Sequence, residues 1–520
     1  MSVRAMARHV LVADSPAAVE RARAGFASLE SWLLAGDTLA LPMHQIEVEQ
    51  ERRGREVLRL LLQAHIEKRG TGDVGPAIEV VVTDDGELDV RRHCERRQHR
   101  RKIHSIFGEV KASRTGYYAA GQESVHPFDK AAALPERTFS YELQRRLIAG
   151  SVQGPFEEAV ERVEDSTGVR VSKRSAEAVV QDAARDFNAF YEQRTPAPAA
   201  DTGSILVGAA DCKGVCMVKS DGAEKVPRLT KGMKKNKKRM ATVATVHTQQ
   251  PRVRTPEEVV DSLFSPKPKI VGAKPKQRDR PEHKRVWASL TAGKDAVIAQ
   301  LGQEMARRDP AGQKQWCMLT DGEKALQKRV VEEFTDDNGA PLQKRVGDNL
   351  ITITLVLDLL HVLEKLWKAA YVFHKEGTPE AVQWVRERAL RILRGEVSQV
   401  IKGIRQSATK RRVKRKARKV IDSVTGYLWN NRSRMRYDDY LRRGLPIASG
   451  VVEGACKNLV KDRMERSGMR WREVGAEAML RLRAVYLSED FDDYWAFHVA
   501  QDQNRLHPVN AWRRPGVFEK

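Results

Sequence analysis

The sequence contains little cysteine and no long hydrophobic run. Of its 520 residues only 5 are cysteine, namely Cys94, Cys212, Cys216, Cys317 and Cys456. No Cys-x-x-Cys pair occurs, so neither a disulfide-stabilised secreted fold nor a zinc knuckle is indicated. No stretch approaches the roughly 20 apolar residues that cross a bilayer, and the first residues lack the apolar part of a signal peptide. We therefore expect a cytoplasmic protein with free thiols and no membrane contact.

Acidic residues are also in deficit. Lysine and arginine total 92 against 69 aspartates and glutamates, which gives a formal net charge of +23. Such an excess indicates a polyanionic partner such as nucleic acid or a membrane surface. A ribosomal or chromatin-like structural protein would share this charge, so charge alone does not indicate an enzyme. The length exceeds what one hydrophobic core usually supports, and three or more structural units are expected.

Residues 141–190 show helical periodicity. The apolar stripe consists of Phe156, Ala159, Val160 and Val163, spaced as on one face of a helix. This helix breaks at Gly168, and Ser172 can cap a second helix whose first turn carries Lys173 and Arg174. In a helix-turn-helix, the first residues of the second helix meet DNA bases and phosphates. An ordinary helical hairpin would show the same pattern, and this alternative stays open.

Two short apolar runs each lead into an aspartate. Ile205–Ala210 precedes Asp211, and Trp316–Thr320 precedes Asp321. Runs of this length predict buried strands. Both aspartates suit a magnesium site, because Mg²⁺ prefers hard oxygen ligands held on rigid elements. An aspartate at a strand end is also a common turn former, so either residue alone is weak support for chemistry.

Further elements are expected between and after these aspartates. Met240–His247 and Leu350–Leu357 are strand-like runs, and the second ends at Asp358. The Pro- and Ala-rich segment 195–202 predicts a domain boundary before the first strand. Residues 362–440 favour a helical region rich in cations.

A third acid lies among bases near the end of the chain. Glu453 follows the glycine-flanked segment 444–452 and precedes Lys457, Lys461 and Arg463. Glu453 and Lys457 are one helical turn apart, so the carboxylate could bind a metal while the cations bind DNA. A surface ion pair is the alternative.

The segments around these acids resemble insertion-sequence transposases of the ISKra type, an acidic-triad family related to Mutator-like transposases. The resemblance rests on DCKGVCM at Asp211, KRMATVATV at Lys238, HKRVWASL at His283, LTDGEKAL at Leu319, LDLLHVLEKLWKAAY at Leu357, GLPIASGVVEGACKNLVKDRM at Gly444 and FDDYWAFH at Phe491. It implies an α/β fold in which an RNase H-like catalytic core is interrupted by an all-helical insertion, with a mainly helical N-terminal DNA-binding region.

The resemblance also implies roles for individual residues. Asp211 would lie on the first strand of the core, Asp321 near the fourth strand and Glu453 on a later helix. All three would be catalytic and would bind Mg²⁺ or Mn²⁺. Asp358 and His361 look like the Asp-or-Cys, two residues, His motif of Mutator-like transposases, and we expect them beside the metal ligands rather than among them. The family carries glycine directly after the first aspartate, where this chain has Cys212.

The expected organisation follows from these assignments. Residues 1–135 form a basic, mixed α/β N-terminal region, 136–200 a helix-turn-helix-like DNA-binding region, 201–361 the first part of the core, 362–440 the helical insertion, 441–485 the last part of the core with the catalytic glutamate, and 486–520 a C-terminal tail.

The function implied is that of a DNA transposase. It would bind the terminal inverted repeats of its element, cleave phosphodiester bonds with metal ions and transfer the strands into target DNA. We expect a homo-oligomer in the synaptic complex, and a protein associated with the nucleoid. DNA contacts are expected from Lys173, Arg174, Lys213, Lys234, Lys235, Lys237, Lys238, Arg239, Lys284, Arg285, Lys457, Lys461 and Arg463. An inactive transposase-derived DNA-binding protein and an RNase H-like nuclease without transposition remain alternatives.

Overall fold

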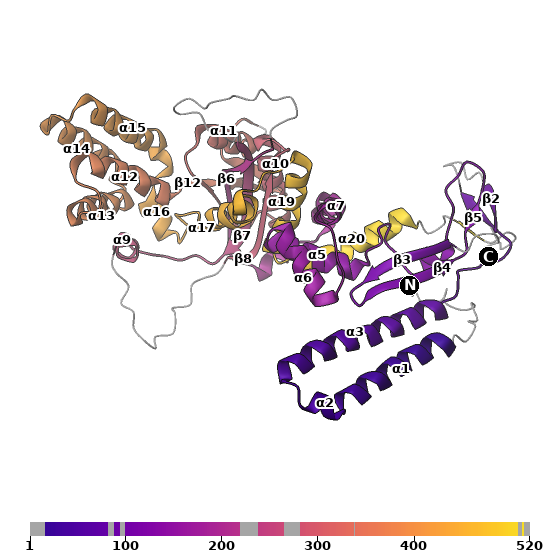
Figure 1. The fold of residues 1–520 in the computed structure, drawn as a ribbon. Helices are drawn as coiled ribbons and strands as arrows, with labels where there is room; N and C mark the ends of the chain where they lie inside the picture. The colour runs from indigo at the N-terminus through magenta and orange to yellow at the C-terminus, as the bar shows by residue number, and fades with distance from the viewer. Residues whose placement is uncertain are drawn as a thin grey trace, which may run out of the picture. The chain divides into compact units, whose positions relative to one another are not determined.

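The chain forms two compact units. The computed structural model describes residues 16–81, 88–93, 99–218, 238–264, 281–336, 338–507 and 512–513. One unit contains Met1–Glu192 and Phe491–Lys520, and the other contains Gln193–Asp490. The protein is mixed α/β, as expected (Figure 1). The six predicted segments divide the chain more finely, and their boundaries stay predictions. Within the ranges described, none of the helices combines the length and apolar content needed to cross a bilayer.

The first unit begins with a pair of long helices. α1 (Pro16–Leu33) and α3 (Met43–Lys68) pack along each other and are joined by α2 (Gly36–Leu39). A small antiparallel sheet follows in the order β13-β1-β2-β5, with a separate hairpin of β3 and β4. The strands are β1 (Ala77–Val81), β2 (Leu88–His93), β3 (His99–Ser105), β4 (Gly108–Arg114), β5 (Tyr117–Tyr118) and β13 (Trp512–Arg513).

The two helices predicted around Gly168 are confirmed. α6 (Phe156–Thr167) ends at Gly168, whose φ of 70° is the left-handed conformation that glycine adopts most readily. α7 (Lys173–Ala183) begins at Ser172, whose hydroxyl accepts the backbone N–H of Ser175 at 3.0 Å. The neighbouring helices are α4 (Pro127–Ala131), α5 (Tyr141–Gln153) and α8 (Phe187–Gln193).

The C-terminal segment predicted as a tail contains a helix that packs within the first unit. α20 (Phe491–Leu506) buries Tyr494, Trp495 and His498. His498 Nδ1 lies 2.7 Å from Asp186 Oδ2, and Arg505 donates to both oxygens of Asp186 at 2.6 and 3.0 Å. Because Asp186 itself is buried and doubly paired, it attaches α20 to the end of α7.

A five-stranded sheet forms the centre of the second unit. Its strand order is β12-β9-β6-β7-β8. β6 is antiparallel to β7 and β7 is antiparallel to β8, whereas β9 is parallel to β6 and β12 is parallel to β9. The strands are β6 (Ile205–Cys216), β7 (Lys238–Gln249), β8 (Glu282–Ser289), β9 (Gln315–Thr320) and β12 (Thr354–Leu357).

Two strand predictions need correction. β6 continues past its predicted end at Ala210, because its pairing with β7 extends to Cys216 while its pairing with β9 ends at Ala209. Asp211 therefore lies inside one ladder and just beyond the other. The run Leu350–Leu357 is divided between β11 (Asn349–Thr352), which forms a hairpin with β10 (Gln343–Val346), and β12.

Helices cover both faces of this sheet. A Cβ at Gly208 would lie 2.8 Å from the sulfur of Met305 on α10 (Lys294–Arg308), so this β6 position faces α10. Asp211 contacts Cys456 on the other face, where α17 (Gly450–Ala455) passes into the π-helical segment η5 (Cys456–Lys461) and α18 (Asp462–Met464). Side chains alternate along a strand, so neighbouring residues of β6 serve opposite faces.

The remaining helices follow β9 and β12. α11 (Lys324–Glu333) follows β9, and α12 (Leu359–Phe373) follows β12. The helical region continues with α13 (Pro379–Leu393), α14 (Val397–Lys410), α15 (Arg415–Asn431) and α16 (Tyr437–Arg442). α9 (Pro256–Phe264) contacts α13, and α19 (Glu473–Leu487) contacts β8.

Candidate metal centre at the edge of the sheet

Three aspartates stand in one row across three neighbouring parallel strands. The ladder between β6 and β9 ends two residues before Asp211 and Asp321. If its register is continued by two residues, the two aspartates lie opposite each other. The ladder between β9 and β12 ends one residue before Asp321 and Asp358. Neighbouring strands lie about 4.8 Å apart, so the three residues share one edge of the sheet. This is the edge at the carboxyl ends of the parallel strands, where open α/β sheets bind ligands.

Asp211 points toward the helical segment that begins with α17. The carboxylate is half-buried, and it accepts the backbone N–H of Cys212 at 2.6 Å on Oδ1 and the thiol of Cys456 at 3.2 Å on Oδ2. A thiol is a weak donor, so Oδ2 can exchange this contact for a cation at small cost.

Asp321 is held mainly through its backbone. Its carbonyl accepts the hydroxyl of Tyr427 at 2.8 Å, and its Oδ1 accepts the N–H of Glu323 at 2.8 Å. Gly322 has φ +87°, and a Cβ there would lie 2.6 Å from the Tyr427 hydroxyl, so only glycine permits this approach. Burial raises the pKa of Asp321, and the negative charge of Asp211 raises it further.

Asp358 is engaged differently. It is fully buried. Its Oδ1 accepts the N–H of Leu360 at 2.6 Å and so caps α12, while its Oδ2 accepts both the N–H of Ser449, at 2.8 Å, and the Ser449 hydroxyl. Both oxygens are therefore occupied by donors of the protein, and the carboxylate ties the start of α12 to the loop that precedes α17.

Glu453 lies beside the predicted Asp358 and His361 pair. One ligand atom from each of these three residues lies within 4.8 Å of the other two. Burial raises the pKa of Glu453, and the charges of Asp358 and Asp211 add to this, while His361 acts in the opposite direction. His361 Nδ1 also lies 3.5 Å from Glu364. Among the described residues, the group whose ligand atoms lie this close together is Asp358, His361 and Glu453, and Asp211 and Asp321 stand outside it. Asp211 and Asp321 are linked to this group only through the charges that shift the pKa of Glu453 and of Asp321.

The donors fit a divalent cation that prefers oxygen. Asp211, Asp321 and Glu453 offer carboxylate oxygens and are only half-buried, so water and a phosphate can complete a shell around Mg²⁺. The nearby imidazole of His361 would be accepted more readily by Mn²⁺ than by Mg²⁺. Like charges brought together in a partly desolvated place are costly without a cation, which is the electrostatic reason to expect one.

Cys212 does not occupy the side of the strand that Asp211 uses. Adjacent side chains of β6 point to opposite faces, and the electrostatic partners of Cys212 include Lys294 on α10. The Cys212 side chain therefore leaves the Asp211 face open.

Several predicted DNA-contacting cations are exposed. Arg174, Lys457 and Lys461 are exposed, and Lys213 and Lys284 are half-buried. Three others are exposed but ion-paired: Lys173 with Glu157, Lys238 with Glu465 and Arg239 with Glu473. Lys234, Lys235 and Lys237 lie outside the described residues.

Two of the predicted DNA contacts are corrected by burial. Arg285 is 9% exposed, pairs with Glu304 at 2.5 Å and stacks over Trp287. Arg463 is 1% exposed and lies over Trp471. Both guanidinium groups therefore belong to the interior of the second unit. The sequence could not predict this, because a run of charged residues does not reveal which of them an aromatic ring will cover.

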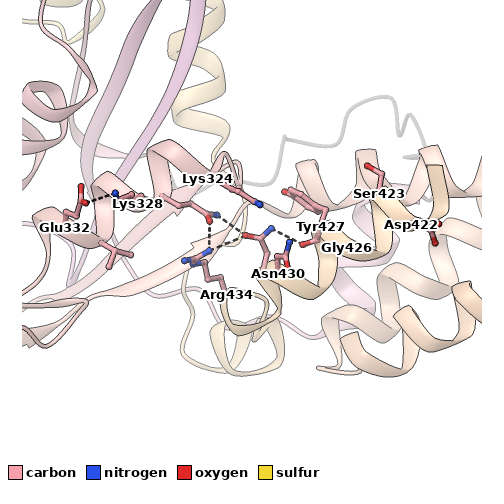
Figure 2. A pocket seen from close by; sticks show the side chains of 13 residues that line it. Lys324, Lys328, Glu332, Asp422, Ser423, Gly426, Tyr427, Asn430 and Arg434 are labelled. Atoms are coloured by element: carbon pink, nitrogen blue, oxygen red, sulfur yellow. Dashed lines mark hydrogen bonds and ion pairs between the residues drawn. The ribbon is translucent and has the colours of Figure 1, made fainter. Parts of the chain in front are cut away.

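A pocket that the sequence did not predict lies next to Asp321. It occupies about 720 Å³ between α11 and α15 (Figure 2). Gly322 and Tyr427 line it and also hold Asp321, while Gln327, Asn431 and Arg434 form a hydrogen-bonded network in its wall. The helical region thus contributes directly to the surroundings of the candidate site. A glycine directly after Asp321 was the only local signal of such a close approach.

The chain was compared with known proteins. No protein-family model matches it, and no curated protein matches it. Among solved structures, it is similar to a Drosophila P element transposase in a strand transfer complex, with a TM-score of 0.27 and 11% identity over 70% of this chain and 81% of that chain. A likeness at this TM-score supports no functional conclusion, and the function is therefore inferred from the carboxylates and their surroundings.

Proposed function

We propose that this protein is a metal-dependent DNA transposase of the ISKra type, which cleaves phosphodiester bonds and transfers strands through Asp211, Asp321 and Glu453. The observation that carries the proposal is the register of the parallel strands β6 and β9, which sets Asp211 of β6 opposite Asp321 directly after β9. The charge of Asp211 also acts on Glu453, which lies on the covering helix. In this proposal, separate elements that are far apart in sequence would supply the oxygens that a two-metal phosphoryl-transfer site requires.

The sheet supports an RNase H-like core. In chain order its strands are arranged 3-2-1-4-5, with the first three antiparallel and the last two parallel to the first. Asp211 lies on the first of these strands and Asp321 directly follows the fourth, as the family resemblance implies. The helices α12 to α16 stand between the fifth strand and the helix of Glu453, which supports the proposed helical insertion.

The chemistry proposed needs no covalent intermediate with the protein. Bound Mg²⁺ or Mn²⁺ would activate the attacking oxygen and stabilise the leaving one. Asp211, Asp321 and Glu453 would hold the cations, and Asp358 would position the loop before Glu453 through Ser449. Exposed cations near the carboxylate, such as Lys457 and Lys461, would hold DNA phosphates.

Partners follow from the same proposal. Terminal inverted repeats would be recognised by the first unit, where α6 and α7 provide the helix pair with Arg174 exposed at its second helix. Pairing of two element ends requires a homo-oligomer, and DNA binding would keep the protein on the nucleoid.

The test is cleavage in vitro. Purified protein is incubated with supercoiled plasmid and with duplexes taken from both flanks of the gene, with Mg²⁺, with Mn²⁺ and with a chelator. We expect metal-dependent nicking at the element ends and joining of the 3′ ends to plasmid. Joining to a target separates a transposase from a plain nuclease. Binding without nicking under any metal condition would indicate the inactive DNA-binding protein instead.

A further inference from the structure

One side of helix α15 carries polar residues that begin at the pocket beside Asp321, with Val420 as the apolar residue among them. Ser423, Tyr427 and Asn430 line the pocket from α15, opposite Lys324 and Lys328 of α11 (Figure 2). These three α15 residues are spaced four and three apart, so they share one side of the helix.

The same side of α15 continues toward its N-terminus as a pair of cations. Lys419 is four residues before Ser423, and Lys416 is seven before it, so both project on the pocket face. Both side chains are exposed, and neither forms an ion pair within the described part of the chain. We call Lys416, Lys419, Ser423, Tyr427 and Asn430 the α15 strip.

The cations of the strip do not serve the stability of the helix. α15 has no acidic residue in its first turn, where the helix dipole favours negative charge. Its start lies instead in the run Lys410–Lys419, which holds eight cations among ten residues and no acid. The arginines of α13 and of its C-cap contrast with this, because Arg386, Arg391 and the C-cap residue Arg394 are each paired with an acid. Lysines without an ion-pair partner at the N-terminal end of a helix, where the helix dipole disfavours positive charge, indicate a negatively charged ligand.

We infer that the α15 strip binds the phosphate backbone of duplex DNA on one side of the phosphate held at the carboxylates. This rests on the proposed function, since it takes the carboxylates as the place of cleavage. Lys416 and Lys419 bind phosphates, and the pocket with Lys324 and Lys328 lies between them and Asp321. The helical region is thereby a substrate-binding arm that fixes the direction in which the duplex leaves the site.

The length of the strip sets the expected position of the contact. With a rise of about 1.5 Å per residue, Lys419 and Lys416 lie about 12 and 17 Å along the helix from Tyr427. At about 3.4 Å per base pair, this corresponds to roughly four and five base pairs from the cleaved phosphate. A duplex that ends before this point cannot reach the two lysines.

The strip favours nucleic acid over a membrane surface. Membrane-binding helices combine cations with a face of large apolar side chains. The α15 strip carries lysines, a serine, a tyrosine and an asparagine, and Val420 is the single large apolar residue exposed among them. The run Lys410–Lys419 contains only Val413 and Ala417 as apolar residues. The strip therefore suits the phosphate backbone of a nucleic acid better than the surface of a lipid bilayer.

The experiment measures salt-dependent DNA binding with a chelator present, so that no cleavage occurs. Full-length wild-type protein is compared with Lys416→Ala/Lys419→Ala on two duplexes from an element end, one extending about 10 base pairs beyond the cleaved phosphate and one about two. The matched control is Lys368→Ala/Lys402→Ala, which removes two exposed cations from α12 and α14.

On the long duplex, the strip variant is expected to bind about 10-fold more weakly and to lower the slope of log K against log salt by about 2, close to 0.9 for each phosphate contact. On the short duplex it should match wild type. An unchanged slope, an equal loss in the control variant, or an equal loss on both duplexes would overturn the inference. Tighter binding to phosphatidylserine vesicles than to DNA would also overturn it.

Failure of the proposed function gives a different result. If wild-type protein nicks no DNA with Mg²⁺ or Mn²⁺ but the strip variant still loses slope on the long duplex alone, the proposed chemistry fails and the phosphate contacts stand. If nicking occurs and the slope is unchanged, the proposed function stands and the α15 strip fails. Thermal unfolding of both variants is measured in parallel, and no loss of stability is expected because all four side chains are exposed.

Discussion

Asp321 and Asp358 follow adjacent parallel strands in one register, yet their surroundings differ. Asp358 is fully buried and accepts three hydrogen bonds, one from Leu360 and two from Ser449. The side chain of Asp321 is half-buried and accepts one hydrogen bond from the described part of the chain, the N–H of Glu323. Burial raises the pKa of Asp321 because its ionised form lacks enough partners.

The difference teaches that position in the sheet does not decide what an acid does. A carboxylate whose oxygens are filled by protein donors stabilises the fold, whereas one left short of donors costs stability and is free to bind a cation. Asp211 belongs with Asp321 in this respect, because one of its two contacts is a weak thiol donor.

Asp321→Asn and Asp211→Asn should each abolish metal-dependent DNA cleavage, by about 1,000-fold or more, because a neutral amide cannot hold a divalent cation that supplies several kcal/mol. Nicking is measured on plasmid DNA, and circular dichroism checks the fold. Asp295→Asn, at an exposed acid on α10, is the matched control and should cleave normally. Normal cleavage by either of the first two variants would remove that residue from the site.

Asp358→Ala should reduce the free energy of unfolding by about 3 kcal/mol, because it leaves the donors of Leu360 and Ser449 without an acceptor. Urea unfolding measures this. Asp358→Asn retains one carbonyl oxygen and should lose about half as much. If Asp358→Asn were as stable as wild type and lacked cleavage entirely, Asp358 would be a metal ligand rather than a residue that stabilises the fold.

Two tyrosines allow a matched test of the backbone at Asp321 and at Asp358. The Tyr427 hydroxyl donates to the carbonyl of Asp321 at 2.8 Å, and the Tyr437 hydroxyl donates to the carbonyl of Leu357, just before Asp358, at 2.7 Å. Each substitution by phenylalanine should cost about 1 kcal/mol of stability. Only Tyr427→Phe should also slow cleavage, by less than about 10-fold. Equal slowing in both would mean that general loosening is responsible.

The smallest effect is a pH dependence of stability, measured in chelator. The folded-state pKa of Asp321 is raised, so its ionised form opposes folding above that pKa, and this penalty disappears below the unfolded value near 3.8. Asp321→Asn should therefore raise Tm at pH 7, by about 2 °C, and the gain should shrink as the pH falls toward 4. A loss of Tm at pH 7 would show that Asp321 stabilises the fold as Asp358 does.

Much of the fold was predictable from local sequence. The strands before Asp211 and Asp321, the break at Gly168 and the cap at Ser172 all appear as expected, because strand length, turn residues and caps depend on a few adjacent side chains. The end of β6 was misplaced, because it depends on pairing with β7, whose partner residues are distant in sequence.

The candidate site was predictable only as a set of residues. Apolar runs indicated the two aspartates, while Glu453 depended on family resemblance. The burial of Arg285 and Arg463 under tryptophan rings could not be read from a basic sequence. The same holds for the pocket beside Asp321, whose walls come from helices about 100 residues apart, as the 104-residue separation of Gln327 and Asn431 illustrates.

By itself, the sequence determined that strands deliver acids among an excess of cations, because hydropathy and charge are properties of the residues. Only the tertiary structure decided which carboxylate has hydrogen-bond donors at both oxygens and which lacks them. Asp358 obtains its donors from Ser449, 91 residues away, while Asp321 meets the charge of Asp211 across a parallel ladder. Hydrogen-bond partners and desolvation arise from contacts between distant segments, and those contacts exist only once the sheet and its covering helices are packed.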